Sequence, residues 1–142
     1  ISMMNYRTID LFAGIGGFRL GFENTGHFTN VFSMENDKFA CLTYLANFNE
    51  NPMGNVASLT DEQIRDLVPD FDVLLAGFPC QAFSIAGHRR GFTEERGQLF
   101  FDVMRFLSIK KPRAFLQFGN SVSVPVVEAI ARNMLKALKE KI

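Results

Sequence analysis

The sequence predicts an α/β fold built on a doubly wound, mostly parallel sheet. Three observations support this. Strand and helix patterns alternate along the chain, a glycine-rich turn follows the first strand, and the most apolar strand, Phe71–Gly77, lies near the middle. With 142 residues, 47% of them hydrophobic and 16 of them Phe, the chain can bury a substantial core. In such a sheet, ligands bind at the carboxyl ends of the strands.

The first part of the chain contains two predicted strand–helix pairs. Thr8–Ala13 is a mostly apolar run that enters the glycine turn, and a helix is predicted to start over Phe18–Glu23. Val31–Glu35 is predicted to be the second strand, followed by a helix over Asp37–Phe48.

The second part continues the alternation. Thr60 and Gln63 have the spacing of a capping box, which predicts the start of a helix that ends before Pro69. Phe71–Gly77 is the most apolar of the predicted strands, as expected for a central parallel strand covered on both faces. The remaining predicted elements are a helix over Leu99–Ile109, a strand over Arg113–Leu116 and a helix over Pro125–Leu138.

The charges of the chain are balanced overall but unevenly distributed. The formal net charge is zero, which argues weakly against a nucleic-acid-binding protein. Residues 50–72 carry six acidic residues and one basic residue, whereas residues 88–113 carry seven basic residues and three acidic ones. Two interpretations stay open: the stretches form two solvated faces, or the basic stretch binds phosphate.

The two cysteines, Cys41 and Cys80, stand in different contexts, and no CxxC motif or Cys/His cluster suggests a metal. We therefore expect two free thiols, a reducing cytoplasmic location and no bound metal. No apolar run approaches the ~20 residues that a membrane span needs, so no membrane partner is expected.

The glycine turn predicts a nucleotide site. In DLFAGIGGFRLGFE, glycines stand at positions 14, 16 and 17, directly after a strand and before a helix. Glycine lets the backbone approach a ligand closely, and the start of a helix offers unpaired N–H groups. Glu35 follows Gly14 by 21 residues at the end of the next strand, where a carboxylate can accept hydrogen bonds from ribose hydroxyls. The spacing is not G-x-G-x-x-G, which favours an adenosine ligand other than NAD.

Two further residues near this turn have alternative interpretations. Phe12 fits the core of a strand as well as it fits stacking on a ligand ring. Asn55, in the segment GNVAS, could accept a hydrogen bond from an adenine amino group, or it could simply form a turn.

A second turn, GFPCQAFSIAG, follows the central strand and carries Cys80. A free cysteine is more often a small buried hydrophobic residue than a nucleophile. Cys80 nevertheless follows a central strand, where a doubly wound fold places its catalytic residues, and nearby arginines would lower the pKa of its thiol. The following segment, Gln81–Gln98, is rich in Gly, Ser and Arg and is predicted to be a loop that binds phosphate.

Four blocks, DLFAGIGGFRLGFE, GFPCQAFSIAG, RGQLFFD and QFGNSVSVPVVEAIA, resemble in this order the signature blocks of the cytosine-C5 DNA methyltransferases, bacterial restriction–modification enzymes above all. The resemblance covers nearly the whole chain. It implies a Rossmann-like core that binds S-adenosylmethionine and releases S-adenosylhomocysteine. At Asn55 the family often carries Asp. The implied cofactor-binding residues are Phe12, Ala13, Gly14, Ile15, Gly16, Glu35, Asn36, Asn55, Val56, Pro79, Leu99, Asn120 and Ser121.

The resemblance also implies a reaction on DNA. In that family a thiolate attacks C6 of a cytosine flipped out of the duplex, C5 takes the methyl group, and a base removes the C5 proton before the sulfur leaves. Cys80 would be the nucleophile and double-stranded DNA the substrate. Gln81 is equally compatible with an ordinary surface residue. The implied DNA contacts are Gln81, Ser84, Arg89, Arg90 and Arg96.

The resemblance breaks after PRAFL, where the family pattern calls for Glu-Asn-Val and then for a target-recognition domain. The chain instead runs from Leu116 directly into Gln117 and the final block. The glutamate would polarise the cytosine, and the domain would read the bases. We expect residues 1–116 to form the N-terminal part of the catalytic domain, residues 117–142 to pack back on it, and the chain alone to have little or no activity.

Other functions stay open beside a weakened enzyme. The chain could be a module that binds S-adenosylmethionine, or a half-enzyme that needs a partner chain. A different nucleotide-binding α/β protein is the third possibility. A sheet that ends at Arg113–Leu116 also exposes an edge, so self-association or strand exchange between copies is expected.

Overall fold

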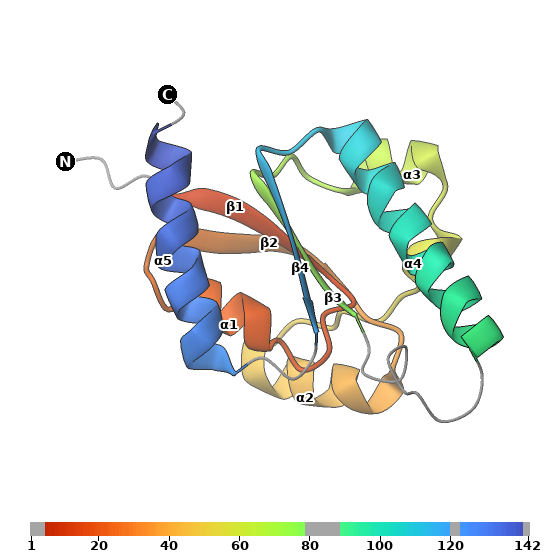
Figure 1. The fold of residues 1–142 in the computed structure, drawn as a ribbon. Helices are drawn as coiled ribbons and strands as arrows, with labels where there is room; N and C mark the ends of the chain where they lie inside the picture. Colours follow the sequence, from red (N-terminus) through yellow and green to blue (C-terminus); the bar gives the residue numbers. More distant parts are fainter. Residues whose placement is uncertain (1–4, 79–88, 120–122, 141–142) are drawn as a thin grey trace.

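The computed structural model describes residues 5–78, 89–119 and 123–140, which form a parallel sheet with helices on both faces (Figure 1). Each neighbouring pair of strands is parallel. The doubly wound sheet predicted from the sequence is therefore confirmed. The strands, in the spatial order β2-β1-β3-β4, are β1 (Tyr6–Leu11), β2 (Phe28–Met34), β3 (Val73–Phe78) and β4 (Ala114–Gly119).

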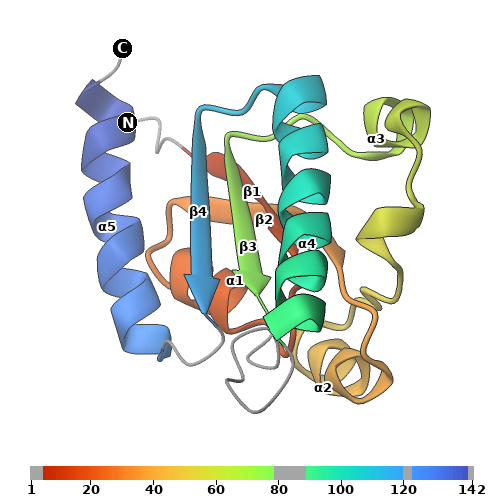
Figure 2. The same cartoon turned by 45° about the vertical axis from the view of Figure 1, so that its right-hand side comes forward.

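The helices form two layers around the sheet (Figures 1 and 2). One layer is made by α1 (Gly17–Glu23) and α5 (Val124–Glu140). The opposite layer is made by the 3₁₀ helix η1 (Val56–Ser58), α3 (Asp61–Leu67) and α4 (Arg89–Lys110). The remaining helix, α2 (Lys38–Phe48), lies at the end of the sheet where the strands finish.

The order of the strands defines where a ligand can bind. The chain passes from β1 outward to β2, then returns past β1 to β3 and β4. The connections beyond β1 and β3 therefore leave toward opposite sides, which opens a crevice at the carboxyl ends of these two strands. Their register pairs Leu11 with Ala76. The glycine turn follows β1 directly, so it lies at this crevice.

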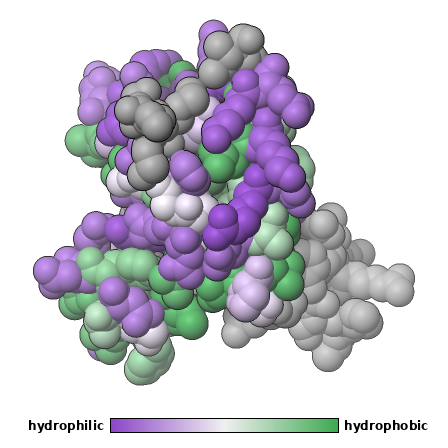
Figure 3. Space-filling model, turned by 90° about the vertical axis from the view of Figure 1, so that its left-hand side faces the viewer, coloured by the Kyte–Doolittle hydropathy of each residue, from purple (hydrophilic) through white to green (hydrophobic). Residues whose placement is uncertain are grey.

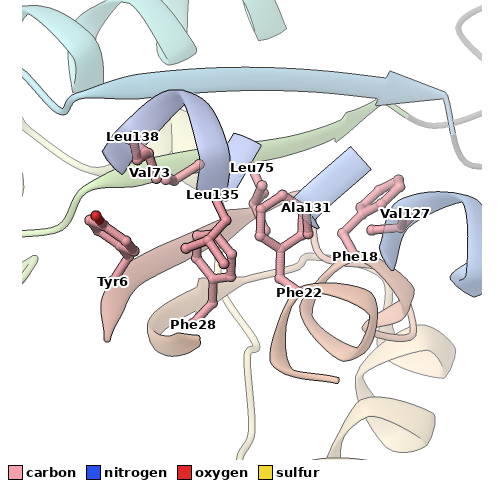
Figure 4. Packing of buried hydrophobic residues seen from close by; sticks show 10 residues of the cluster. All are labelled: Tyr6, Phe18, Phe22, Phe28, Val73, Leu75, Val127, Ala131, Leu135 and Leu138. Atoms are coloured by element: carbon pink, nitrogen blue, oxygen red, sulfur yellow. The ribbon is translucent and has the colours of Figure 1, made fainter. Parts of the chain in front are cut away.

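Two hydrophobic clusters, one on each face of the sheet, hold the layers together. Successive residues of β3 alternate between them, because Val73 and Leu75 contact one cluster while Leu74 and Ala76 contact the other. This confirms that the central strand is covered on both faces. The cluster between the sheet, α1 and α5 contains Tyr6, Phe18, Phe22, Phe28, Val73, Leu75, Val127, Ala131, Leu135 and Leu138 (Figure 4). The cluster under η1, α3 and α4 contains Ile9, Leu11, Val56, Ile64, Val68, Phe71, Leu74, Ala76, Val103 and Phe106.

Most predicted elements are present, and the capping box of Thr60 and Gln63 forms as expected. One prediction is wrong: residues 89–98 are not a loop but the first part of α4, which is 22 residues long. Apolar periodicity identifies only the part of a helix that packs on a core, whereas this part consists largely of Glu, Arg and Gln, which favour helix without such a pattern.

The last strand is also longer than predicted. β4 continues past Leu116 to Gly119, because residues 117–119 pair with residues 76–78 of β3. The strand thus crosses the boundary between residues 1–116 and 117–142, and the division of the chain at that boundary stays a prediction.

The surface is uneven in polarity. In Figure 3 hydrophilic residues predominate over the upper part of the face, and hydrophobic residues gather at the lower end, at the height of α2. Phe39 and Leu42 of α2 are among the exposed large hydrophobic residues. Within residues 5–78, 89–119 and 123–140, no helix combines the length and the apolar character needed to cross a bilayer.

Candidate functional site

A cavity of about 260 Å³ opens where β1 and β2 end. Its wall combines apolar side chains with carboxylates and amides, a mixture suited to a ligand that has both a ring and polar groups. Among its residues are five that the sequence predicted. The residues that line this first cavity are Phe12, Glu35, Asn36, Asn55, Ala57, Gln98, Leu99 and Asp102.

Glu35 is a polar group of the first cavity whose two carboxylate oxygens are both held by backbone N–H groups. Its Oε1 accepts a hydrogen bond of 2.8 Å from the N–H of Gly14, and its Oε2 accepts one of 2.8 Å from the N–H of Asp37. A carboxylate has about four lone-pair positions, so both oxygens keep capacity for a ligand. One side chain therefore fixes the glycine turn and also presents acceptors at the cavity.

Phe12 and Asn55 lie on the wall of the first cavity in distinctive backbone settings. Phe12 has φ 55°, a left-handed conformation that is strained for a bulky side chain. Asn55 is the N-cap of η1, because its Oδ1 accepts a hydrogen bond of 3.0 Å from the N–H of Ala57. The turn-forming role is thus what the structure shows for Asn55, and its predicted contact with adenine stays a prediction.

A second cavity, of about 350 Å³, lies along the glycine turn and the start of α5. It includes three of the predicted cofactor residues. Its lining residues are Ala13, Gly14, Ile15, Gly17, Phe18, Ser123 and Val124.

The glycines of the turn serve different purposes. Gly14 and Gly16 both have positive φ, at 58° and 94°. A Cβ at Gly14 would meet nothing within 4 Å, whereas a Cβ at Gly16 would lie 2.1 Å from Cε2 of Phe48. Gly16 is therefore required by the packing of α2 against the turn, and it does not border either cavity. Val56, also predicted to bind the cofactor, is buried in the core and likewise borders neither.

Several predicted site residues cannot be placed. The side chains of Arg89, Arg90 and Arg96 belong to α4 but are not part of the description, and their predicted DNA contacts stay predictions. Outside the described residues lie Pro79, Cys80, Gln81, Ser84, Asn120 and Ser121.

The polar residues that α4 contributes to the first cavity were not predicted from the sequence. Gln98 and Asp102 lie on the same side of α4 as Leu99, which was predicted, and their spacing of three and four residues could have indicated this. Asp102 is buried, and its carboxylate accepts hydrogen bonds from Gln98 and Arg105. Ala57 lines the cavity because it belongs to the turn that Asn55 caps, and no sequence pattern predicts it.

A polar network around the buried side chain of Arg19 connects α1 with α2 and with the residue that follows its C-cap. Arg19 forms salt bridges with Glu23 at 2.9 Å and Glu50 at 2.6 Å, and it donates a hydrogen bond to the hydroxyl of Tyr44. Burial opposes the charge of Arg19, but the hydrogen bonds to Glu50, Tyr44 and Glu23 raise its pKa above the ordinary value. The guanidinium group also lies 4.4 Å from the ring centre of Phe48.

Asp10 of β1 is fully buried, and its carboxyl oxygens have no hydrogen-bond partner among the described residues. Burial raises the pKa of Asp10 well above its ordinary value of 3.8; Arg19 opposes the shift, and Glu35 and Glu23 add to it. Between pH 3.8 and the raised pKa, the folded chain therefore binds a proton at Asp10 that the unfolded chain releases. The free energy of unfolding consequently decreases as the pH rises through this range.

Replacing Asp10 by Asn should remove this contribution. We expect the free energy of unfolding of Asp10→Asn, relative to the parent chain, to increase from acidic to neutral pH, by up to about 1.4 kcal/mol per pH unit. Urea unfolding of both chains across this range measures the difference. Parallel stability curves would show that Asp10 is ionised in the folded chain.

Ion pairs within the domain connect the acidic stretch with the basic stretch. Arg105 of the basic stretch pairs with Asp61 of the acidic stretch at 3.0 Å, and Lys110 pairs with Asp70 at 3.6 Å. Arg113 donates to the carbonyl oxygen of Leu138. Among the described side chains, three basic residues of this stretch therefore make polar contacts within the domain. Among the described residues, no group of three or more His, Cys, Asp or Glu side chains is arranged to hold a metal ion.

The sequence is similar to those of known DNA methyltransferases. Residues 6–117 match a family described as C-5 cytosine-specific DNA methylase. The chain is 56% identical over 111 residues to the Type II methyltransferase M.NgoBI of Neisseria gonorrhoeae, covering 78% of this chain and 33% of that protein. It is 55% identical over 114 residues to M.HaeII of Haemophilus aegyptius, covering 80% of this chain and 34% of that protein. The chain thus spans about a third of the length of these curated relatives.

The fold is also similar to solved methyltransferase structures. The structure of the Entamoeba histolytica methyltransferase EhMeth superimposes with a TM-score of 0.64 at 19% identity. The match covers 94% of this chain and 44% of that protein. At this identity the comparison shows a shared fold. The shared part is less than half of the Entamoeba histolytica protein.

Proposed function

The chain belongs to the C-5 cytosine-specific DNA methylase family, and from this premise we propose that it is the cofactor-binding core of a DNA methyltransferase, binding S-adenosylmethionine in the two cavities. The observation that carries the proposal is Glu35, whose carboxylate is fixed by Gly14 and Asp37 at the end of β2. The cofactor supplies the methyl group.

The residues of the first cavity fit an adenosine group. Glu35 keeps acceptor capacity for ribose hydroxyls, and Asn36 and Asn55 offer amide groups for polar atoms. Phe12 and Leu99 offer apolar surface for a planar ring. The second cavity is lined in part by Gly14 and would take the part of the cofactor beyond the adenosine group.

We further propose that Cys80 attacks C6 of a cytosine in double-stranded DNA, as in the family. Attack by the thiolate breaks the aromaticity of the ring and makes C5 nucleophilic, and departure of the sulfur follows loss of the C5 proton. Gln81, Ser84, Arg89, Arg90 and Arg96 would contact the DNA. A cytoplasmic location stays a prediction from the expected free thiols, of which Cys41 is unpaired in the structure.

Activity of this chain alone is proposed to be weak. Its sequence runs from PRAFL directly into QFGNSV, without the Glu-Asn-Val that would position an acid and without the base-reading domain that the family pattern places between these blocks. The alternative is a half-enzyme that becomes active with a partner chain. Added partner chain would raise turnover in the second case only.

Two experiments test the proposed function. Calorimetry should show binding of S-adenosylmethionine and S-adenosylhomocysteine but not of NAD; tight binding of NAD alone would identify a different nucleotide-binding protein. A duplex that contains 5-fluorocytosine should form a small amount of gel-stable adduct in the presence of S-adenosylmethionine. The adduct should be lost in Cys80→Ser, and its absence under every condition would exclude Cys80 as the nucleophile in this chain.

We also propose that the edge of β4 mediates self-association. β4 pairs with β3 on one side, and its residues Ala114–Gln117 are only partly buried. Sedimentation should show oligomers whose proportion rises with concentration, and a monomer at all concentrations would contradict the proposal.

A further inference from the structure

We propose that Arg105 is a positioning residue for the first cavity: its guanidinium group ties the two walls together and thereby sets the affinity for the ligand. The part of this proposal that concerns ligand affinity rests on the proposed function, in which this cavity binds the cofactor. Arg105 itself does not line the first cavity.

The two walls come from distant parts of the chain. One wall belongs to α4 and contributes Gln98, Leu99 and Asp102, and the other belongs to the turn of η1 and contributes Asn55 and Ala57. No short stretch of chain fixes their separation, because forty residues, 58–97, lie between the two walls, and Leu59 and Arg105 are 46 residues apart. The width of the cavity therefore depends on contacts between η1 and α4.

Arg105 makes polar contacts with both walls. Its Nη1 donates to Oδ1 of Asp102 at 3.2 Å, within the α4 wall. Its Nη2 donates to the carbonyl oxygen of Leu59, two residues after Ala57, and its Nε donates to Oδ1 of Asp61 at 3.0 Å. Guanidinium is a rigid planar group, so three acceptors bound to it are held in a fixed arrangement.

Burial makes this arrangement sensitive to loss of Arg105. The side chains of Arg105 and Asp102 are only 16% and 2% exposed. A buried carboxylate requires a compensating partner. Without Arg105, the hydrogen bonds to Asp102 that remain among the described side chains come from Gln98, at 3.3 and 3.4 Å. Because Gln98 and Asp102 both line the cavity, their rearrangement would alter its wall directly.

Lys110 provides a matched control on the same helix. Its Nζ donates to the carbonyl oxygen of Arg65 at 3.1 Å and pairs with Asp70 at 3.6 Å, so it also ties α4 to the α3 segment. None of these three residues lines either cavity. Lys110→Ala should therefore lower stability without changing the cavity.

The test compares Arg105→Lys, Arg105→Ala and Lys110→Ala in the full chain. Calorimetry should show that S-adenosylhomocysteine binds about tenfold more weakly to both Arg105 variants, as expected for loss of a contact between coupled groups. Lys cannot replace the fork of Arg, so Arg105→Lys should not restore binding. Hydrogen exchange at the amides of Ala57, Ser58 and Leu59 in the unliganded chain should accelerate in the Arg105 variants only.

Each outcome is decisive. Unchanged exchange in Arg105→Lys, or exchange that rises equally in Lys110→Ala, would overturn the proposal. Faster exchange with unchanged affinity would show that Arg105 holds the walls but does not set affinity, which also overturns it. If the parent chain bound no S-adenosylhomocysteine, the proposed function would fail, and the exchange measurement alone would decide whether Arg105 ties the walls. Arg105→Lys keeps the charge and the stem, so it decides the question if Arg105→Ala does not fold.

Discussion

Gly16→Ala should lower the free energy of unfolding by about 2–5 kcal/mol, as measured by urea unfolding. A side chain at φ 94° costs about 1–2 kcal/mol. Overpacking adds about 1–3 kcal/mol, since the new methyl group would lie 2.1 Å from Cε2 and 2.9 Å from Cζ of Phe48. The Phe48 ring cannot easily move away, because it is packed against Arg19 at 4.4 Å and against the ring of Tyr44 at 4.7 Å.

Gly14→Ala is the control that measures the cost of a side chain at positive φ without a steric clash. It also has positive φ, at 58°, but open space around it, so a loss of only about 1–2 kcal/mol is expected. Phe48→Leu removes the atoms that clash, so the double variant Gly16→Ala/Phe48→Leu should be more stable than the sum of the single effects predicts. Equal losses for the two alanine variants would mean that contact with α2 contributes nothing to the requirement for Gly16.

Glu35→Gln should weaken binding of S-adenosylhomocysteine by about one to two orders of magnitude, the usual effect of losing a hydrogen bond to a charged group. A glutamine has one acceptor oxygen, so its NH₂ group would face the N–H of either Gly14 or Asp37. The glycine turn would lose its anchor even before a ligand binds. The unliganded chain should accordingly be less stable as well, which calorimetry and urea unfolding would measure together.

Asp37→Asn is the matched control for this variant. Asp37 caps α2 through Oδ1, which accepts hydrogen bonds from the N–H groups of Phe39 and Ala40, and Asn is an equally good cap. Its affinity should be close to that of the parent chain. If Glu35→Gln lowered affinity but left the stability of the unliganded chain unchanged, Glu35 would serve the ligand alone and not the turn.

The sequence predicted those parts of the fold that depend on local pattern. The glycine turn, the capping box of Thr60 and the apolar strand β3 each have a signal within a few residues. The role of Gly16 could not be found in this way, because it depends on Phe48 from a helix that folds back onto the turn. The pairing of Arg105 with Asp61 likewise joins two charged stretches that, in sequence, looked like separate surfaces.

The contact between the first and last helices has a consequence for how such cores are assembled. α5 is held by its packing on α1, through Phe22 and Val127 among others, and not by the length of its connection to β4 (Figure 4). Lengthening a loop costs only about 0.6 kcal/mol for each doubling. A longer connection ahead of α5 is therefore compatible with the packing of α5 on α1, at a cost of about 0.6 kcal/mol for each doubling of its length.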